Sequence, residues 1–283
     1  MDGAARVVIV TGGSMGIGKE IARAFSQNGD YVVICARQKE SLQQTAHEIE
    51  SFPGQVVPVV CNIADQVAVK RLVDYTAERF RCIDVLVNNA GIYGPIGLAF
   101  DNDPQEWVET LEVNLFGVFL MTKYAVPIMI ERGHGAIINL SGGGATSPKP
   151  RYSAYAASKA AVVRFTEVLA QELAEYHIRV NAIAPGFIAT RIHDKTIAAG
   201  EKAGADLAKV KESLRAGGDD PRLTAELALF LASQEAEQIT GRLISAVWDD
   251  WRSLKENQSS LDSSDLFTIR RIDNVYYQRV TKR

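Results

Sequence analysis

Hydrophobic and polar residues alternate in blocks along this chain. Short apolar, largely β-branched runs predict strands, and these runs are Arg6–Thr11, Tyr31–Cys35, Val56–Cys61, Val85–Asn88, Ala136–Leu140, Arg179–Ala184 and Arg242–Val247. Between them, apolar residues recur at helical spacing over Gly18–Asn28, Glu40–Ser51, Ala64–Phe80, Glu106–Ile130, Ser153–Tyr176 and Leu223–Ala232. Strands that are apolar throughout and separated by helices predict a parallel sheet covered on both faces. We therefore expect a doubly wound α/β domain with a seven-stranded parallel sheet.

Residues 187–220 interrupt this alternation, because they are rich in Ala, Gly and Lys and show no strand pattern. They lie between the sixth and seventh predicted strands, where an insertion can cover the carboxyl ends of the sheet. We expect a helical lid there.

The chain after Trp251 also departs from the pattern. Residues 255–265 are polar and predict a linker, and the basic, aromatic sequence that follows allows two interpretations. One is a frayed extension, and the other is an arm that packs on a neighbouring subunit. The arm is favoured by apolar side chains that need a covering surface, namely Phe267, Ile269, Ile272, Val275 and Tyr276. The expected organisation is one domain over residues 1–251 and an extension over residues 252–283.

Composition narrows the classes of function. A hydrophobic fraction of 47% in 283 residues argues for a large core and against global disorder. The formal net charge of −3 argues against nucleic-acid binding. The cysteines Cys35, Cys61 and Cys82 form no CxxC pair, and the four histidines form no HxH or HExxH motif. We expect free thiols and no metal.

The sequence passes directly from MDGAAR into VVIVTGG, and no apolar run is read as long enough to span a membrane. We therefore expect no signal peptide and no membrane contact. The expected location is the cytoplasm.

The sequence TGGSMGIG, residues 11–18, follows the first predicted strand and opens the first predicted helix. Its glycines allow a tight turn and a close approach of backbone N–H groups to a pyrophosphate, which the positive end of the helix also attracts. The spacing is TGxxxGxG rather than GxGxxG. Its position between a strand and a helix predicts a dinucleotide site.

Arg37 stands about 20 residues beyond this turn, where an acidic residue would bind the ribose 2′-hydroxyl of NAD(H). A guanidinium suits a 2′-phosphate and offers no acceptor to a hydroxyl. Arg37 therefore predicts NADP(H) in preference to NAD(H). The alternative is that Arg37 only solvates the end of its strand.

Tyr155 and Lys159 are four residues apart on one predicted helix, so their side chains share a face. A nearby ammonium favours the phenolate and lowers the pKa of a tyrosine. Such a tyrosine can donate a proton to a carbonyl or accept one from an alcohol while hydride moves.

With these motifs together, the sequence resembles the short-chain dehydrogenase/reductase family. The matching motifs are TGGSMGIG at 11–18, NNAG at 88–91, VNLFG with Asn114, YAASK at 155–159, APG at 184–186 and TGRLISAVW near the end. The match runs from residue 6 to about residue 250, in order and with similar spacings. It implies a Rossmann fold that binds a nicotinamide dinucleotide.

The resemblance implies a role for each matching residue. Tyr155 would be the catalytic acid or base, Lys159 would lower its pKa and hold the nicotinamide ribose, and Asn114 would hold a water that links Lys159 to a proton relay. Asn62 stands where the family usually has an Asp that contacts adenine. The expected cofactor-binding residues are Thr11, Gly12, Ser14, Met15, Gly16, Ile17, Gly18, Arg37, Asn62, Ile63, Asn89, Ala90, Gly91, Tyr155, Lys159, Pro185, Gly186, Ile188 and Thr190.

One position departs from the family pattern. Relatives usually carry a serine 13 positions before the tyrosine, to hydrogen-bond the substrate oxygen, and this chain has Gly142 there. We favour Ser141 as the working serine and fourth catalytic residue, because a loop absorbs a single insertion readily. The alternative is that backbone N–H groups of Gly142–Gly144 take the serine's place.

The expected function is an NADP(H)-dependent oxidoreductase that interconverts a small-molecule secondary alcohol and a ketone. The alternatives are a cofactor-binding sensor or scaffold without turnover, and an epimerase or dehydratase on the same fold.

Tyr152 is expected to form part of the wall of the substrate pocket. Charged residues flank the predicted mouth of the pocket, and they are Lys149, Arg151, Arg191, His193 and Lys195. We favour the interpretation that they form a solvated rim. The less favoured alternative is that they bind an anionic substrate. The resemblance implies a homodimer or homotetramer built on the two longest helices.

Overall fold

The computed structural model describes residues 5–256, 258, 261 and 264–271. Its centre is a parallel sheet of seven strands in the order β3-β2-β1-β4-β5-β6-β7. The strands are β1 (Val7–Thr11), β2 (Tyr31–Ala36), β3 (Val56–Val60), β4 (Val85–Asn88), β5 (Gly135–Leu140), β6 (Ile178–Ala184) and β7 (Leu243–Ser245). Every predicted strand is present, and the predicted doubly wound fold is confirmed.

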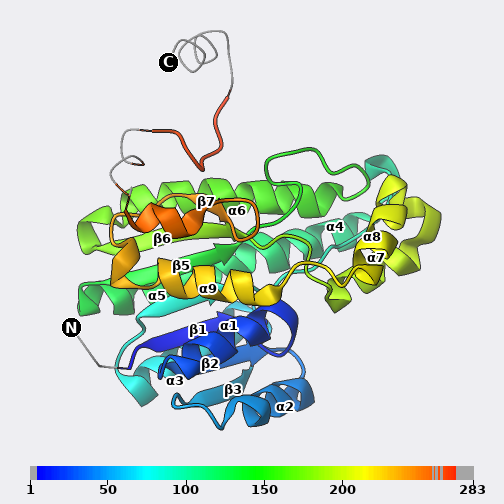
Figure 1. Cartoon of the computed structure of the whole chain (residues 1–283). Coiled ribbons are helices and arrows are strands. Elements are labelled where there is room, and N and C mark those ends of the chain that lie inside the picture. Colours follow the sequence, from blue (N-terminus) through cyan, green and yellow to red (C-terminus); the bar gives the residue numbers. More distant parts are fainter. Residues whose placement is uncertain (1–4, 257, 259–260, 262–263, 272–283) are drawn as a thin grey trace.

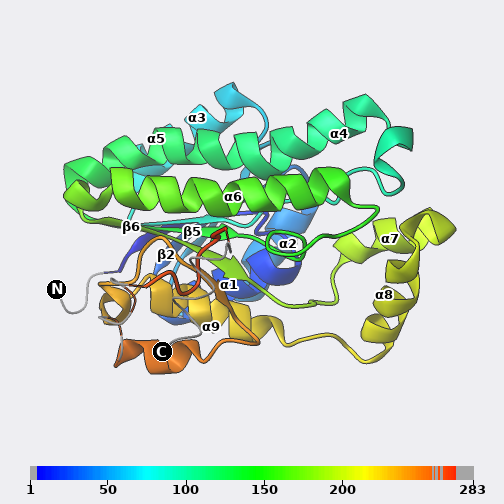
Figure 2. The same cartoon turned by 90° about the horizontal axis from the view of Figure 1, so that it is seen from above.

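Helices cover both faces of the sheet, as Figure 2 shows in the view from above. One face is covered by α1 (Gly16–Gln27), α2 (Lys39–Ile49) and α9 (Pro221–Leu231). The other is covered by α3 (Gln66–Phe80), α5 (Gly117–Arg132) and α6 (Ser153–Glu172). The short turns η1 (Ala99–Asp101), η3 (Ala174–Tyr176) and η6 (Gln234–Ala236) lie in the connections.

The core follows from the alternation of side chains along each strand. In β1, Val8 and Val10 pack in the cluster beneath α1, and Ile9 packs in the cluster on the opposite face. All three side chains are fully buried, which stabilises the fold by about 1.5–3 kcal/mol for each. Strands of this kind have no polar face, which explains the continuous apolar runs in the sequence.

The predicted helix Glu106–Ile130 is three segments: α4 (Pro104–Leu111), a π-helical turn η2 (Glu112–Phe116) and α5. Over Pro104–Arg132 this run is long and apolar enough, by length and composition alone, to cross a membrane, so the expectation that no run reaches that length was wrong. Half of its most apolar stretch is buried within the protein, and core helices commonly meet the same criterion.

The predicted lid is helical. It contains η4 (Arg191–His193), α7 (Asp194–Ala199), η5 (Gly200–Ala203) and α8 (Ala205–Arg215). Among the described residues of the lid, β-type pairing is limited to one isolated bridge between Ile188 and Gly218. Figure 1 shows α7 and α8 beyond the end of the sheet. Asp219 closes the base of the lid, because its carboxylate accepts a hydrogen bond of 2.6 Å from the backbone N–H of Phe187.

The described part of the C-terminal extension packs on its own chain. It begins with η7 (Trp251–Lys255), and Leu261 and Phe267 join the core cluster beneath α9. The Leu243 N–H of the edge strand β7 donates to the Phe267 carbonyl at 2.7 Å. Ile272, Val275 and Tyr276 lie outside the described residues, so packing on a partner subunit stays a prediction.

Candidate active site

A cavity of about 850 Å³ opens at the carboxyl ends of the strands. It lies where the strand order reverses, between β1 and β4, which is the usual ligand site of an open α/β sheet. Seventeen of the nineteen expected cofactor-binding residues line its wall, and the two that do not are Thr11 and Gly18. Of the expected catalytic residues, Ser141, Tyr155 and Lys159 line it and Asn114 does not.

The Gly-rich turn is packed so closely that a side chain on Gly12 or Gly18 would force neighbouring backbone atoms to move. A Cβ atom on Gly18 would lie 2.3 Å from the Gly12 carbonyl oxygen, and one on Gly12 would lie 2.8 Å from Nδ2 of Asn89. Gly12 and Gly16 also have positive φ angles of 65° and 54°. These contacts explain the glycine spacing that the sequence showed.

Thr11 and Asn89 brace this turn against the neighbouring strand. The Asn89 amide donates to the Thr11 carbonyl at 2.8 Å, and the Thr11 hydroxyl accepts from the backbone N–H groups of Asn89 and Ala90. A brace that sequence reasoning missed is Thr45 of α2, whose hydroxyl donates to the Ser14 carbonyl at 2.8 Å. Thr11 therefore shapes the site from behind its wall.

The N-terminus of α1 is suited to an anion. Its N-cap residue Met15 makes no side-chain capping bond, whereas Asp65, Asp103 and Asp220 cap α3, α4 and α9. The first N–H groups of α1 are thus left for another acceptor, which a phosphate can provide. The turn therefore fits the pyrophosphate of a dinucleotide.

Arg37 and Asn62 line the cavity beyond the ends of β2 and β3, the side on which an adenosine would lie. Arg37 is exposed, and no Asp or Glu stands among the described residues that line the cavity. Cys35 and Cys61 line the same region as buried free thiols, and Cys82 is also free. No group of three or more His, Cys, Asp or Glu side chains that could hold a metal occurs in the described residues.

Tyr155 and Lys159 lie side by side on α6, as predicted. The Lys159 ammonium is 5.7 Å from the centre of the Tyr155 ring and donates to the Leu140 carbonyl at 2.8 Å. Burial raises the pKa of Tyr155 above its usual value and lowers the pKa of Lys159 to about 8. In this structure, then, burial outweighs the expected lowering of the tyrosine pKa by the lysine.

Asn114 lies in the π-helical turn η2, a kind of distortion often found at functional sites. Its amide donates to the Ile92 carbonyl at 2.8 Å and to the Ser158 hydroxyl at 3.0 Å, and its oxygen accepts from the Ile92 N–H. Asn114 therefore holds the loop after β4 against α6. Its expected role in holding a water stays a prediction.

Ser141 and Gly142 are placed differently with respect to Tyr155. The Ser141 side chain is buried, and its hydroxyl lies 3.4 Å from the Lys159 carbonyl oxygen, which it approaches as a donor. Gly142 faces the tyrosine, because a Cβ atom built on it would lie 2.4 Å from the Tyr155 hydroxyl oxygen.

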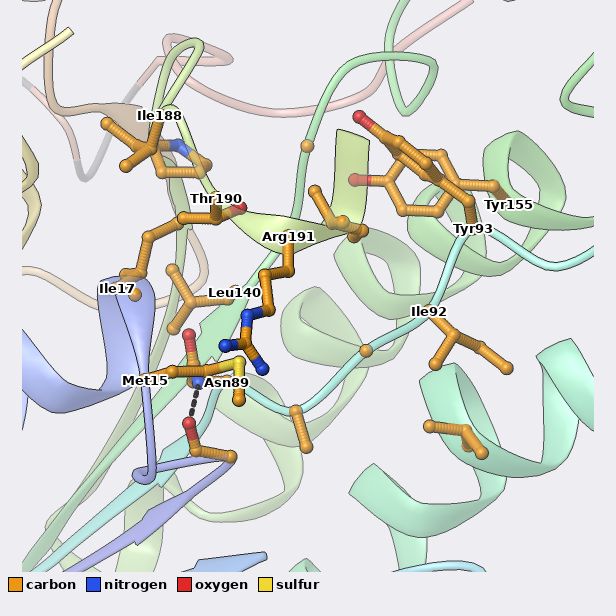
Figure 3. A pocket seen from close by; sticks show the side chains of 18 of the residues that line it. Met15, Ile17, Asn89, Ile92, Tyr93, Leu140, Tyr155, Ile188, Thr190 and Arg191 are labelled. Atoms are coloured by element: carbon orange, nitrogen blue, oxygen red, sulfur yellow. Dashed lines mark hydrogen bonds between the residues drawn. The ribbon is translucent and has the colours of Figure 1, made fainter. Parts of the chain in front are cut away.

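Two aromatic residues at the site had no motif to reveal them. Tyr93 lies edge-on to Tyr155 with ring centres 4.8 Å apart, and its hydroxyl is 3.2 Å from Nδ1 of His193 (Figure 3). Nε2 of His193 is 3.0 Å from the Ile188 carbonyl, which can only accept, so Nδ1 accepts from Tyr93. Burial also lowers the pKa of His193.

Two expectations about this region were wrong. His193 is not a solvated rim residue, since it is 5% exposed. Tyr152 is not a wall of the cavity but is fully buried, with its hydroxyl 3.0 Å from that of Thr196. Tyr152 is held by Thr196 of the lid helix α7, and His193, itself a lid residue, faces inward to Tyr93 and to the Ile188 carbonyl.

Comparison with known proteins agrees with this geometry. Residues 6–200 match the family model described as short chain dehydrogenase. A 3-oxoacyl-(acyl-carrier-protein) reductase of Thermotoga maritima is 39% identical over 239 residues, covering 84% of this chain and 95% of that protein. An NAD-dependent glycerol dehydrogenase of Listeria innocua is 36% identical over 83% of this chain and 90% of that protein.

A solved structure of an actinorhodin polyketide ketoreductase with NADPH is also similar. It has 31% sequence identity and a TM-score of 0.79, over 85% of this chain and 95% of that one. The model match, the relatives and the site geometry agree. The chain is an NAD(P)-binding oxidoreductase and belongs to the short-chain dehydrogenase/reductase family.

Proposed function

We propose that this protein interconverts a small secondary alcohol and a ketone with NADP(H), using Tyr155 as the proton donor or acceptor. One observation carries the proposal: Tyr155 and Lys159 are buried together at the wall of the cavity. The turn before α1, whose N-terminus has no side-chain cap, lines the same cavity. A phenol and an ammonium near a site for a nicotinamide suit proton transfer coupled to hydride transfer.

In the direction of reduction, the Tyr155 hydroxyl donates its proton to the substrate oxygen. In the direction of oxidation, the tyrosinate accepts the proton of the alcohol. The bound nicotinamide supplies or removes the hydride. Lys159 is held by the Leu140 carbonyl close to Tyr155, where its positive charge favours the ionised tyrosine when both face a polar ligand.

The geometry supports backbone N–H groups of the Gly142–Gly144 segment, rather than Ser141, as partners of the substrate oxygen. Gly142 lies against the Tyr155 hydroxyl, and the Ser141 hydroxyl is directed to a backbone carbonyl. Donors of the main chain are fixed before the substrate binds, so they can stabilise negative charge on the oxygen at little cost in reorganisation.

Arg37 supports NADP(H) as the cofactor. Arg37 is exposed and lines the cavity on the side where the adenosine would lie. No Asp or Glu is found among the described residues of the cavity wall. A guanidinium can bind a 2′-phosphate through two parallel hydrogen bonds. Titration calorimetry should give a lower Kd for NADPH than for NADH, and a lower Kd for NADH would overturn this preference.

The substrate is proposed only as a class. Relatives are named as a 3-oxoacyl-(acyl-carrier-protein) reductase, a glycerol dehydrogenase and a polyketide ketoreductase, and these names share a carbonyl or an alcohol as the reacting group.

We also propose a homodimer or homotetramer, because Phe116 and Phe119 of the η2–α5 segment are 44% and 41% exposed. The cytoplasmic location stays a prediction from the sequence.

A turnover screen tests the proposed activity. Ketones with NADPH and alcohols with NADP+ would be followed by absorbance of the reduced nicotinamide, with Tyr155→Phe as the matched variant. We expect turnover of at least one secondary alcohol or ketone, and a loss of roughly 10²–10⁴-fold in kcat for Tyr155→Phe, which should still bind NADPH. Binding of NADPH without turnover of any compound would favour the sensor or scaffold alternative.

A further inference from the structure

The cavity has an unusual balance of charge. Five cationic side chains line it, and they are Arg37, Lys149, Lys159, Arg191 and Lys195. The described residues of the same wall include no carboxylate. Such a wall attracts an anionic ligand.

Three of these cations already have partners. Lys149 forms an ion pair with Asp206 of α8, and Lys195 forms one of 3.0 Å with Glu106 of α4. Lys159 donates to the Leu140 carbonyl. These contacts hold the lid and the catalytic helix in place.

Arg37 and Arg191 differ from the other three. Neither guanidinium has a hydrogen bond or an ion pair with any residue that the structure describes, and both residues are exposed. Two cations without a protein partner therefore face a cavity that fits a dinucleotide. Arg37 lies at its adenosine side, so the 2′-phosphate accounts for one of them.

Arg191 lies next to the Gly-rich turn. It is the first residue of η4, the first helical turn of the lid. The preceding Thr190 packs so closely on the Gly-rich turn that a Cβ atom on Gly16 would be 2.8 Å from the Thr190 Cγ2 atom. Figure 3 shows the Arg191 side chain extending from the lid toward Met15 and Asn89. The guanidinium thus points to the uncapped end of α1, where the N–H groups leave room for an anion.

We propose that Arg191 binds the pyrophosphate of the dinucleotide cofactor from the lid side, opposite the N–H groups of α1. This inference rests on the proposed cofactor binding and adds to it a residue outside the Gly-rich turn. The planar guanidinium donates two parallel hydrogen bonds to phosphate oxygens, and its charge offsets that of the pyrophosphate. Arg37 and Arg191 then recognise different anionic groups of the same ligand.

Cofactor affinities measured by titration calorimetry separate these two roles without any substrate. The ligands are NADPH, NADH and ADP-ribose, which all carry a pyrophosphate, whereas only NADPH carries the 2′-phosphate. The variants are Arg191→Met and Arg37→Met. The control is Arg215→Met, which removes an exposed arginine of the same lid at the end of α8, outside the cavity wall.

We expect Arg191→Met to raise the Kd of all three ligands by the same factor, roughly tenfold for one exposed phosphate contact. Arg37→Met should raise the Kd of NADPH alone, and Arg215→Met should change none. An Arg191→Met Kd for NADPH within twofold of the unmodified protein would overturn the inference. A loss confined to NADPH would also overturn it, because the contact would then be to the 2′-phosphate.

The experiment also separates this inference from the function on which it rests. If the unmodified protein bound neither NADPH nor NADH, the proposed cofactor and the role of Arg191 would both fail. If it bound them normally and Arg191→Met bound them equally well, the role of Arg191 alone would fail.

Discussion

The hydroxyl oxygen of Tyr155 lies against the backbone of Gly142, in the space that a side chain at position 142 would occupy. A Cβ atom there would be 2.4 Å from that oxygen, far inside van der Waals contact. The glycine that departs from the family pattern is therefore tied to the position of Tyr155, the proposed proton donor or acceptor.

Replacing Gly142 by alanine or serine should lower activity rather than restore a missing serine. The new side chain would displace the Tyr155 hydroxyl, and a displacement of about 1 Å at a reacting group can cost roughly 100-fold in rate. The measurement is kcat for each variant. Gly143→Ala is the matched control because nothing lies within 4 Å of its Cβ position, and a higher kcat for Gly142→Ser would contradict the argument.

Replacing Ser141 by alanine should leave kcat within about threefold of the unmodified protein. The substitution removes one long hydrogen bond to the Lys159 carbonyl, which is worth about 1 kcal/mol or less to stability. Steady-state kinetics and a thermal unfolding curve check both effects. A loss of kcat beyond about 100-fold with normal stability would instead make Ser141 the serine that contacts the substrate.

The stability of the protein should respond to pH through Lys159. Burial lowers the pKa of Lys159 from 10.5 to about 8, so between these values the unfolded chain binds more protons than the folded one. The contribution of this group to the free energy of unfolding therefore rises with pH from about 8 to 10.5. The rise is about 3 kcal/mol for a shift of this size.

The check is chemical denaturation at pH 7.5, 9 and 10.5 for the unmodified protein and for Lys159→Met. The unmodified protein should gain stability relative to the variant across this range, since other groups titrate in both. Lys195→Met serves as the control, because Lys195 is an exposed lysine. A difference that stays constant with pH would show that Lys159 is not desolvated.

The exposed phenylalanines near the start of α5 should form a subunit interface. Phe116 and Phe119 stack with ring centres 5.8 Å apart, and Phe119 also faces Phe165 of α6 at 6.4 Å. A charge placed in a buried apolar interface costs several kcal/mol, so Phe119→Glu should reduce the mass seen by light scattering. A monomeric mass for the unmodified protein would contradict the predicted dimer or tetramer.

Removal of the C-terminal extension should destabilise the domain. A chain ending at residue 256 loses Leu261 and Phe267 from the core cluster and leaves the Leu243 N–H of β7 without its acceptor. We expect a loss of at least about 3 kcal/mol in the free energy of unfolding. A chain ending at residue 271 keeps these contacts and should retain its stability. A lower mass of the latter in light scattering would support packing of the last residues on a partner.

The sequence by itself determined the sheet and the cofactor turn. A strand buried on both faces must be largely apolar, so runs such as Arg6–Thr11 and Arg179–Ala184 were visible without any knowledge of their neighbours. The glycines of the turn and the pair Tyr155–Lys159 were visible for a similar reason. Each depends on spacing within one turn or one helix, which the order of residues fixes directly.

Only the tertiary structure decided how distant segments meet. Tyr93 and His193 are 100 residues apart, and no local pattern predicts that a lid residue will accept a hydrogen bond from a loop after β4. The tertiary structure also decided that Gly142, and not Ser141, faces Tyr155. A one-residue shift along a strand turns a side chain to the opposite face, and the local sequence does not specify which face the tyrosine occupies. Arg191 could be read only as a charge near the mouth of the site, because its position beside the Gly-rich turn depends on how the lid folds back across the sheet.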